Sequence, residues 1–163
     1  MTDEIAAHFA NSAVVSRLSE KTPAERRSAI VELEARLRDF PQFDFDANLT
    51  HHFSHGVYSR ELFMPAGVVV VGKIHRHTCF NVIQHGRVWV VTEGEGLQEL
   101  IGPTVWVSSP GTKRAVYVME DTVWITCHGS HETDLARLEA EVIVPSYAAL
   151  EAEQRAQLEG PKT

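Results

Sequence analysis

The chain has 163 residues, 44% of them hydrophobic and 23% charged, which suits one globular domain with a sizeable core and leaves no room for a second full domain. A formal net charge of −7 argues against nucleic acid or an anionic membrane as a partner, because both require a basic face. The sequence has no apolar run of the roughly 18 residues that a membrane span needs and starts with an acidic segment, so we expect a cytoplasmic protein without a secretory signal.

The N-terminal part of the chain predicts helices. Residues 3–18 fit one or two short helical turns. Residues 22–25 give a stronger signal, since they combine a Thr/Glu capping-box pair with proline at the first helical position. The helix that begins there is expected to run to about Arg38 and to end before Pro41. We assign residues 1–45 to an N-terminal helical segment.

From Phe43 onward, short apolar runs separated by Gly, Pro and Asn predict β-strands. The expected strands are Val57–Met64, Val68–His77, Phe80–Gln84, Arg87–Thr92, Leu97–Ile101, Thr104–Val107, Ala115–Met119 and Thr122–His128. Three histidines before the first strand, His51, His52 and His55, are interpreted as part of a polar loop. Eight or so short strands at close spacing favour an antiparallel barrel or double-sheet jelly roll, which we place at residues 46–130.

The last part of the chain, residues 131–163, predicts helices again. Asp134 to Val142 carries apolar residues at helical spacing, and Ser146 is placed to cap a final helix. We expect these helices to pack on the barrel, so that the whole chain forms one domain. They would cover open sheet edges and could supply a dimer contact.

Two histidines, His75 and His77, follow the apolar run Val68–Val71. On one strand their side chains would project from the same face, with Cα atoms about 6.5 Å apart at a rise of about 3.3 Å per residue. Both imidazoles could then reach one metal ion at bond lengths of about 2.0–2.1 Å. The alternative for an isolated His-x-His is a surface strand with two solvated histidines.

The region from Val57 to His128 resembles the cupin superfamily, through the His-x-His pair on an early strand and the Pro-Gly turn at residues 110–111 before the last hairpin. Residues 60–67, 72–75, 109–114 and 120–124 are also similar to a group of small, mostly uncharacterised cupin proteins of bacteria and phages. The resemblance implies a mainly β, cupin-type antiparallel β-barrel with N- and C-terminal helices. It also implies a homodimer, as is usual in the superfamily.

The sequence departs from the general cupin pattern, which supplies two histidines and a glutamate from the first motif and one histidine from the second. His75 and His77 match the first pair, but the glutamate position falls near Asn81 and the last histidine position holds Arg114. Because a stable site needs three or more protein ligands, we expect His128, at the end of the last strand, to be the third ligand. The alternative is that His128 caps the following turn.

Other side chains are candidates for contacts with a bound molecule. Arg114 is always cationic and could anchor a carboxylate or phosphate, whereas Lys113 is more simply explained as a solvated base. Tyr117 could line the same cavity or pack in the core. Gln84 and Cys79 are weaker candidates, which could surround the site or lie in the core.

Two classes of function follow. The first is a metal-dependent enzyme in which His75, His77 and His128 hold iron, manganese, nickel or zinc, and a small-molecule substrate enters the barrel. Iron would give oxygenase chemistry and zinc would give hydrolase chemistry. The second is a non-catalytic cupin that binds a small anionic ligand or a protein partner, with Arg114 in place of a metal ligand.

Overall fold

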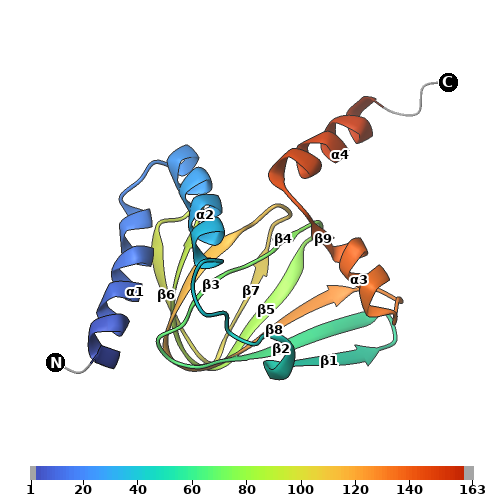
Figure 1. The fold of residues 1–163 in the computed structure, drawn as a ribbon. Helices are drawn as coiled ribbons and strands as arrows, with labels where there is room; N and C mark the ends of the chain where they lie inside the picture. Colours follow the sequence, from blue (N-terminus) through green and yellow to red (C-terminus); the bar gives the residue numbers. More distant parts are fainter. Residues whose placement is uncertain (1–2, 160–163) are drawn as a thin grey trace.

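The structure is a computed structural model that describes residues 3–159. Two helices, α1 (Asp3–Ser19) and α2 (Pro23–Leu37), and a 3-10 turn, η1 (Asp46–Asn48), precede the strands. The strands are β1 (Leu49–Ser54), β2 (Val57–Met64), β3 (Val69–Val71), β4 (Ile74–His75), β5 (Cys79–Thr92), β6 (Leu97–Ile101), β7 (Thr104–Ser108) and β8 (Arg114–Gly129). The chain ends with α3 (Leu135–Val142), β9 (Ile143–Val144) and α4 (Tyr147–Glu159), as Figure 1 shows.

Two long strands, β5 and β8, organise the fold because each pairs with different strands along its two halves. The first half of β5 pairs with β7 and with the second half of β8, which continues the sheet to β2 and β1. The second half of β5 pairs with β6 and with the first half of β8, beside which β3 lies. All these pairs are antiparallel, so the predicted double-sheet jelly roll with terminal helices is confirmed. Hydrogen bonding among the described strands does not close the sheets into a complete barrel.

The sequence predicted breaks in β5 at residues 85–86 and in β8 between residues 119 and 122, and both predictions are wrong. The two strands continue through these points, where the register between them shifts. Gly86 has a φ of +97°, and a Cβ atom there would collide with Thr122 and with the carbonyl of Asp121. Glycine therefore allows β5 to bend in a bulge where another residue would force the strands apart.

The loop predicted around His51 and His52 is a strand. These residues belong to β1, which forms a hairpin with β2. Gly56 in the connecting turn has a φ of +72°, a conformation that glycine adopts without strain. Because Leu49 and His51 alternate with exposed residues along β1, this extra strand adds two side chains to the wall of the interior cavity.

The single strand predicted from Val68 to His77 is divided into β3 and β4. β4 pairs with β9, which lies far along the chain. After it, the Arg76 backbone N–H donates to Val142, and the Arg76 guanidinium donates to three carbonyls near the C-terminal end of α3 at 3.1–3.2 Å. Arginine binds readily to such free helix-end carbonyls. The chain therefore bends at Arg76, and His77 lies in this bend with an exposed side chain.

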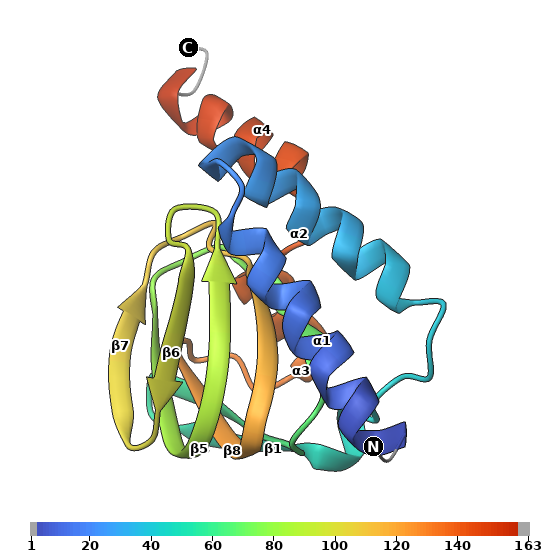
Figure 2. The same cartoon turned by 90° about the vertical axis from the view of Figure 1, so that its left-hand side faces the viewer.

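The buried apolar residues form two main clusters on opposite sides of the strands. The cluster between the sheets contains Met64, Val70, Ile83, Val88, Val90, Val116, Val118 and Trp124. The cluster under the N-terminal helices contains Val15, Leu18, Ile30, Val91, Ala115 and Tyr117. Figure 2 shows α1 and α2 beside the sheet and β7 on the uncovered side. Burial of each large side chain stabilises the fold by about 1.5–3 kcal/mol.

The predicted helix caps are present. In α2 the Thr22 N–H donates to the Glu25 carboxylate at 2.9 Å, and the Glu25 N–H donates to the Thr22 hydroxyl at 3.5 Å. The Ser146 hydroxyl accepts the Ala149 N–H at the start of α4. The helix α1 is one continuous element, longer than the short turns predicted. Within residues 3–159, no helix combines the length and apolar character that crossing a membrane requires.

Candidate metal site and adjoining cavity

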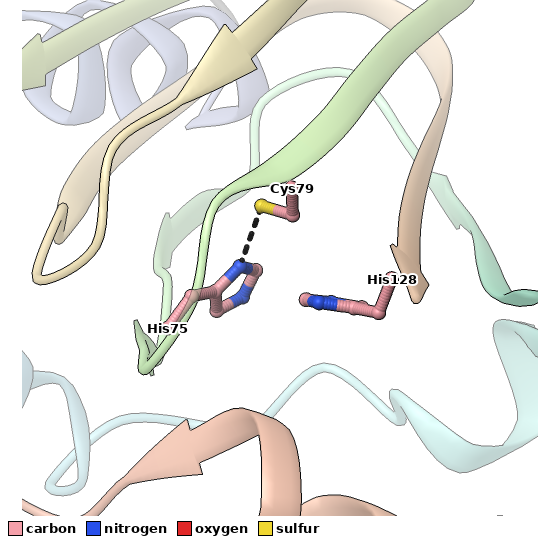
Figure 3. A group of neighbouring side chains, drawn as sticks. All are labelled: His75, Cys79 and His128. Atoms are coloured by element: carbon pink, nitrogen blue, oxygen red, sulfur yellow. Dashed lines mark hydrogen bonds between the residues drawn. The ribbon is translucent and has the colours of Figure 1, made fainter. Parts of the chain in front are cut away.

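Three buried side chains converge at one end of the jelly roll: His75 from β4, Cys79 from the start of β5 and His128 from the end of β8. Their ligand atoms all lie within 4.8 Å of one another. The side chains are only 8%, 3% and 3% exposed, so bulk water does not separate them. Figure 3 shows the rings of His75 and His128 directed towards each other, with Cys79 above His75. The ring centroids are 4.9 Å apart.

Both ring nitrogens of His75 have partners. Nδ1 lies 3.0 Å from Sγ of Cys79, and Nε2 lies 3.4 Å from Nη2 of Arg60. A guanidinium only donates hydrogen bonds, so Nε2 accepts and the proton of the neutral ring is on Nδ1. Nδ1 therefore donates to the sulfur of Cys79.

His128 differs, because neither of its ring nitrogens has a hydrogen-bond partner among the described residues. The ring stacks against Tyr58 at a centroid distance of 6.3 Å. A buried nitrogen without a partner is costly, so this ring lacks the hydrogen bonds that a purely structural histidine usually makes. The predicted alternative of a turn cap does not fit this arrangement.

The electrostatics of the site keep both histidines neutral near pH 7. Burial lowers the pKa of His75 to about 3, and the positive charges near it, including Arg60 and Arg114, act in the same direction. Burial lowers the pKa of His128 to about 4, again with a contribution from Arg60. Neutral imidazole is the form that binds metal ions, so no proton has to be displaced from a histidinium.

Cys79 is a thiol in these surroundings. Burial raises its pKa, and a hydrogen bond from Nδ2 of Asn81 to Sγ, at 3.7 Å, counteracts part of this effect. A thiol becomes a strong ligand only as the thiolate, and a nearby metal cation favours that form. Cys79 is therefore suited to bind a cation and is otherwise protonated.

Asn81, near the position where the cupin pattern has a glutamate, links three strands behind Cys79. Its Nδ2 donates to the Ser108 hydroxyl at 2.6 Å, and its Oδ1 accepts from Trp124 Nε1 at 3.1 Å and from the Thr126 hydroxyl at 3.4 Å. The Ser108 hydroxyl also accepts from the guanidinium of Arg114. Because its amide is fully used in this network, Asn81 fixes the strands that carry the site.

A cavity of about 410 Å³ adjoins the site. Its wall is formed by the inner faces of β1, β2, β3 and β8 and by α3, and most of it is apolar, with Leu62, Met64 and Val70 among its residues. His75, Arg60 and Arg114 also line it. Within residues 3–159 neither of these two arginines forms an ion pair with a carboxylate, whereas Lys73 at the cavity pairs with Glu139. The cavity therefore carries positive charge on an apolar wall.

The structure brings together two of the three histidines predicted as metal ligands. His75 and His128 belong to the cluster, whereas His77 is exposed and lies outside it. Cys79 takes part instead, although it appeared to be a weaker candidate. Its position at the start of a strand whose inner face continues through Asn81 was the available signal, because residues two apart share one face of a strand.

Of the other residues predicted to contact a bound molecule, one lines the cavity and two do not. Arg114 lines the cavity, as expected for an anchor of an anionic group. Tyr117 packs under α1 and α2, on the opposite side of β8 from the cavity, and Gln84 is exposed and does not line the cavity. The expectation of a solvated Lys113 is wrong: it is 5% exposed and binds Glu34 and the carbonyl of Gly72, both at 2.9 Å.

The donor set fits a divalent metal ion. Two neutral imidazoles and one thiol lie at one point, and the unpartnered nitrogens of His128 have no other role among the described residues. Two nitrogens and one sulfur are ligands that zinc and other transition metals accept. The ligand atoms are a potential metal-binding group.

Comparison with known proteins concerns the fold. No family model and no curated protein matches the sequence. Among solved structures, ectoine synthase from P. lautus is similar over 61% of this chain and 75% of its own, at 11% identity and a TM-score of 0.49. KdgF from Halomonas sp. is similar over 60% and 93%, at 17% identity and a TM-score of 0.45. A cupin-2 domain protein from Shewanella frigidimarina is similar over 60% and 92%, at 8% identity and a TM-score of 0.43.

The chain is similar to these structures in the arrangement of its antiparallel strands. At these identities the similarity concerns the arrangement of the strands and not the chemistry. Of the residues compared with the cupin pattern in the sequence, His75 lies in the cluster, whereas the position expected for the glutamate falls near Asn81 and that of the second-motif histidine holds Arg114. Cys79 and His128 stand beside His75 in their place.

Proposed function

We propose that this cupin binds a divalent metal ion through His75, Cys79 and His128 and binds a small molecule in the adjoining cavity. The observation that carries the proposal is the convergence of three buried ligand atoms within 4.8 Å. The unpartnered ring of His128 supports it, because a metal ion would satisfy a nitrogen that no described residue satisfies.

Among iron, manganese, nickel and zinc, the ligands favour zinc. A thiolate is a soft ligand that suits zinc, whereas manganese prefers oxygen ligands. Three protein ligands also leave one position free, as in catalytic zinc sites. A zinc ion held this way would activate a water molecule near neutral pH, which favours hydrolase over oxygenase chemistry.

The residues of the cavity would bind and orient the molecule that reacts. The mostly apolar wall would hold its apolar part and exclude water, and the guanidinium of Arg114 would bind an anionic group. Ser108 and the ring of Trp106, whose centroid lies 6.0 Å from the guanidinium carbon, hold Arg114 in place. Because Asn81 connects this arginine to the strand of Cys79, the anion and the metal site share one rigid frame.

A second candidate function is a non-catalytic cupin that binds a small anion without a metal ion. The contact of Arg60 with Nε2 of His75 favours it, because this guanidinium occupies a nitrogen that could otherwise bind metal. The two candidates share the cavity and differ in the use of His75, Cys79 and His128.

Metal analysis of the purified protein separates them. We expect about one zinc ion per chain in the wild type after dialysis against zinc, and much less in His128→Ala and Cys79→Ser. His77→Ala is the matched control, since it removes an exposed histidine two residues from His75 and should retain the metal. Absence of stoichiometric metal from the wild type would leave only the anion-binding function. Loss of metal in His77→Ala but not in Cys79→Ser would restore the ligand set predicted from the sequence.

A further inference from the structure

Arg60 must give up its hydrogen bond to His75 whenever a metal ion binds that ring. Nε2 accepts from Arg60 at 3.4 Å, and Nδ1 carries the proton that faces Cys79 at 3.0 Å. An ion that takes Nε2 displaces the guanidinium directly. An ion that takes Nδ1 moves the ring proton to Nε2, where two donors would then face each other. The contact is lost on either route.

No buried, unpaired carboxylate lines the described cavity wall to receive the released guanidinium. The acidic residues that line the cavity are Asp46, which is exposed in η1, and Glu139, which already pairs with Lys73. Arg114 lines the same cavity and likewise forms no ion pair within residues 3–159. A divalent ion would therefore stand beside two guanidinium groups that have no ion-pair partner within residues 3–159, since Glu139 and Glu95 act on Arg60 and Arg114 only from beyond ion-pair distance. Charge repulsion is strong in these surroundings of low polarity.

We propose that a small organic carboxylate occupies this cavity, and that its binding and the binding of the metal ion strengthen each other through Arg60. The inference rests on the metal site proposed above. Arg60 and Arg114 would hold the carboxylate, since a guanidinium matches its two oxygens. The apolar part of the wall favours an organic anion over inorganic phosphate, and the volume of about 410 Å³ suits a small molecule.

The two binding events are coupled because the carboxylate replaces His75 as the partner of Arg60 and offsets the charge of the metal ion. By linkage, the factor by which the carboxylate raises metal affinity equals the factor by which the metal raises carboxylate affinity. Without the carboxylate, Arg60 competes with the metal for His75. Removal of this guanidinium should therefore raise metal affinity by itself.

The test measures zinc affinity by competition with a chromophoric chelator at constant ionic strength. The probes are benzoate and glutarate, with benzamide and glutaramide as uncharged controls, and the chelator is calibrated in each solution. We expect the carboxylates, but not the amides, to lower the zinc Kd of the wild type about tenfold. Arg60→Met should bind zinc about tenfold more tightly without any carboxylate, and a carboxylate should change its zinc Kd much less than that of the wild type, because only Arg114 still holds the anion. Arg155→Met, an exposed arginine of α4, is the matched control for loss of a charge and should behave like the wild type.

The outcomes separate this inference from the function on which it rests. The coupling is overturned, while the metal site stands, if the carboxylates do not change the zinc Kd of the wild type and Arg60→Met has the same zinc Kd as the wild type. If inorganic phosphate has the same effect as the carboxylates, the assignment to an organic carboxylate is overturned. If neither the wild type nor Arg60→Met binds zinc under any of these conditions while both retain the wild-type circular dichroism and thermal midpoint, the metal-binding function itself fails.

Discussion

The ring of His128 stands at 61° to the ring of His75, with the two centroids 4.9 Å apart. Protonation of either ring is unfavourable, because each ring is buried. A protonated ring would also be repelled by positive charge on the other ring and on Arg60. This pair determines how the metal-free protein should respond to acid.

The metal-free protein should lose stability as the pH falls below about 6.5. In the folded state the pKa of His75 is about 3 and that of His128 is about 4, both below the ordinary histidine value of 6.5. Between these values the unfolded chain binds protons that the folded chain does not, so the free energy of unfolding decreases with falling pH, by up to about 1.4 kcal/mol per pH unit for each ring. Urea unfolding between pH 7.5 and pH 4.5 measures this slope. A slope in His128→Leu as steep as in the wild type would contradict it, and His77→Ala should retain the wild-type slope.

Replacement of Lys113 by methionine should lower the free energy of unfolding by about 2 kcal/mol, because Glu34 and the carbonyl of Gly72 lose a buried partner. Lys73→Met is the control. Its ion pair with Glu139 is half-exposed on both sides, and its loss should cost no more than about 0.5 kcal/mol. Urea unfolding at pH 7.5 compares the two variants, and equal effects would show that Lys113 is solvated as the sequence suggested.

Replacement of Asn81 by leucine should destabilise the protein by about 2–3 kcal/mol, since Trp124, Ser108 and Thr126 would lose buried hydrogen bonds. The indole of Trp124 would lose its acceptor, so we also expect a change in tryptophan fluorescence. Gln84→Leu changes an exposed amide on the same strand and should shift the free energy of unfolding by about 0.5 kcal/mol or less. If the two variants are equally stable, the network does not hold the strands together.

Replacement of Arg114 by methionine should leave the zinc content unchanged and raise the carboxylate concentration needed for half-maximal effect about tenfold, because a charged hydrogen bond to the anion is lost. The chelator competition described for Arg60 provides the measurement. An unchanged carboxylate response would show that Arg114 does not contact the ligand. Thermal unfolding of the variant checks that the loss of the bond to Ser108 has not disrupted the fold.

The homodimer predicted from the superfamily resemblance is checked by sedimentation velocity. The outer face of β5 and β7 carries Phe80, Val105 and Val107, which are 56%, 60% and 58% exposed, and apolar side chains in such a group are often covered by a partner. If this face forms the dimer, Phe80→Asp should shift the protein to a monomer. A monomeric wild type at micromolar concentration would remove the prediction.

Local sequence signals determined much of the fold. The capping box of Thr22 and Glu25 placed the start of α2 correctly, and strands such as β2 and β6 were predicted with their observed bounds. The reason is that helix caps and the alternation of apolar residues act within a few residues of the chain. The antiparallel jelly-roll arrangement, the burial of His75 and the place of Arg114 on the cavity wall followed from such signals and from the motifs that resemble the superfamily.

Tertiary structure decided the composition of the site. Residues two apart, such as His75 and His77, share one face only while the strand continues. β4 ends because Arg76 binds carbonyls at the end of α3, some 65 residues away in sequence. Cys79 then starts a new strand beside His128, an arrangement set by the register of β5 against β8. The identity of the third ligand therefore depends on long-range hydrogen bonds, which a local pattern does not contain.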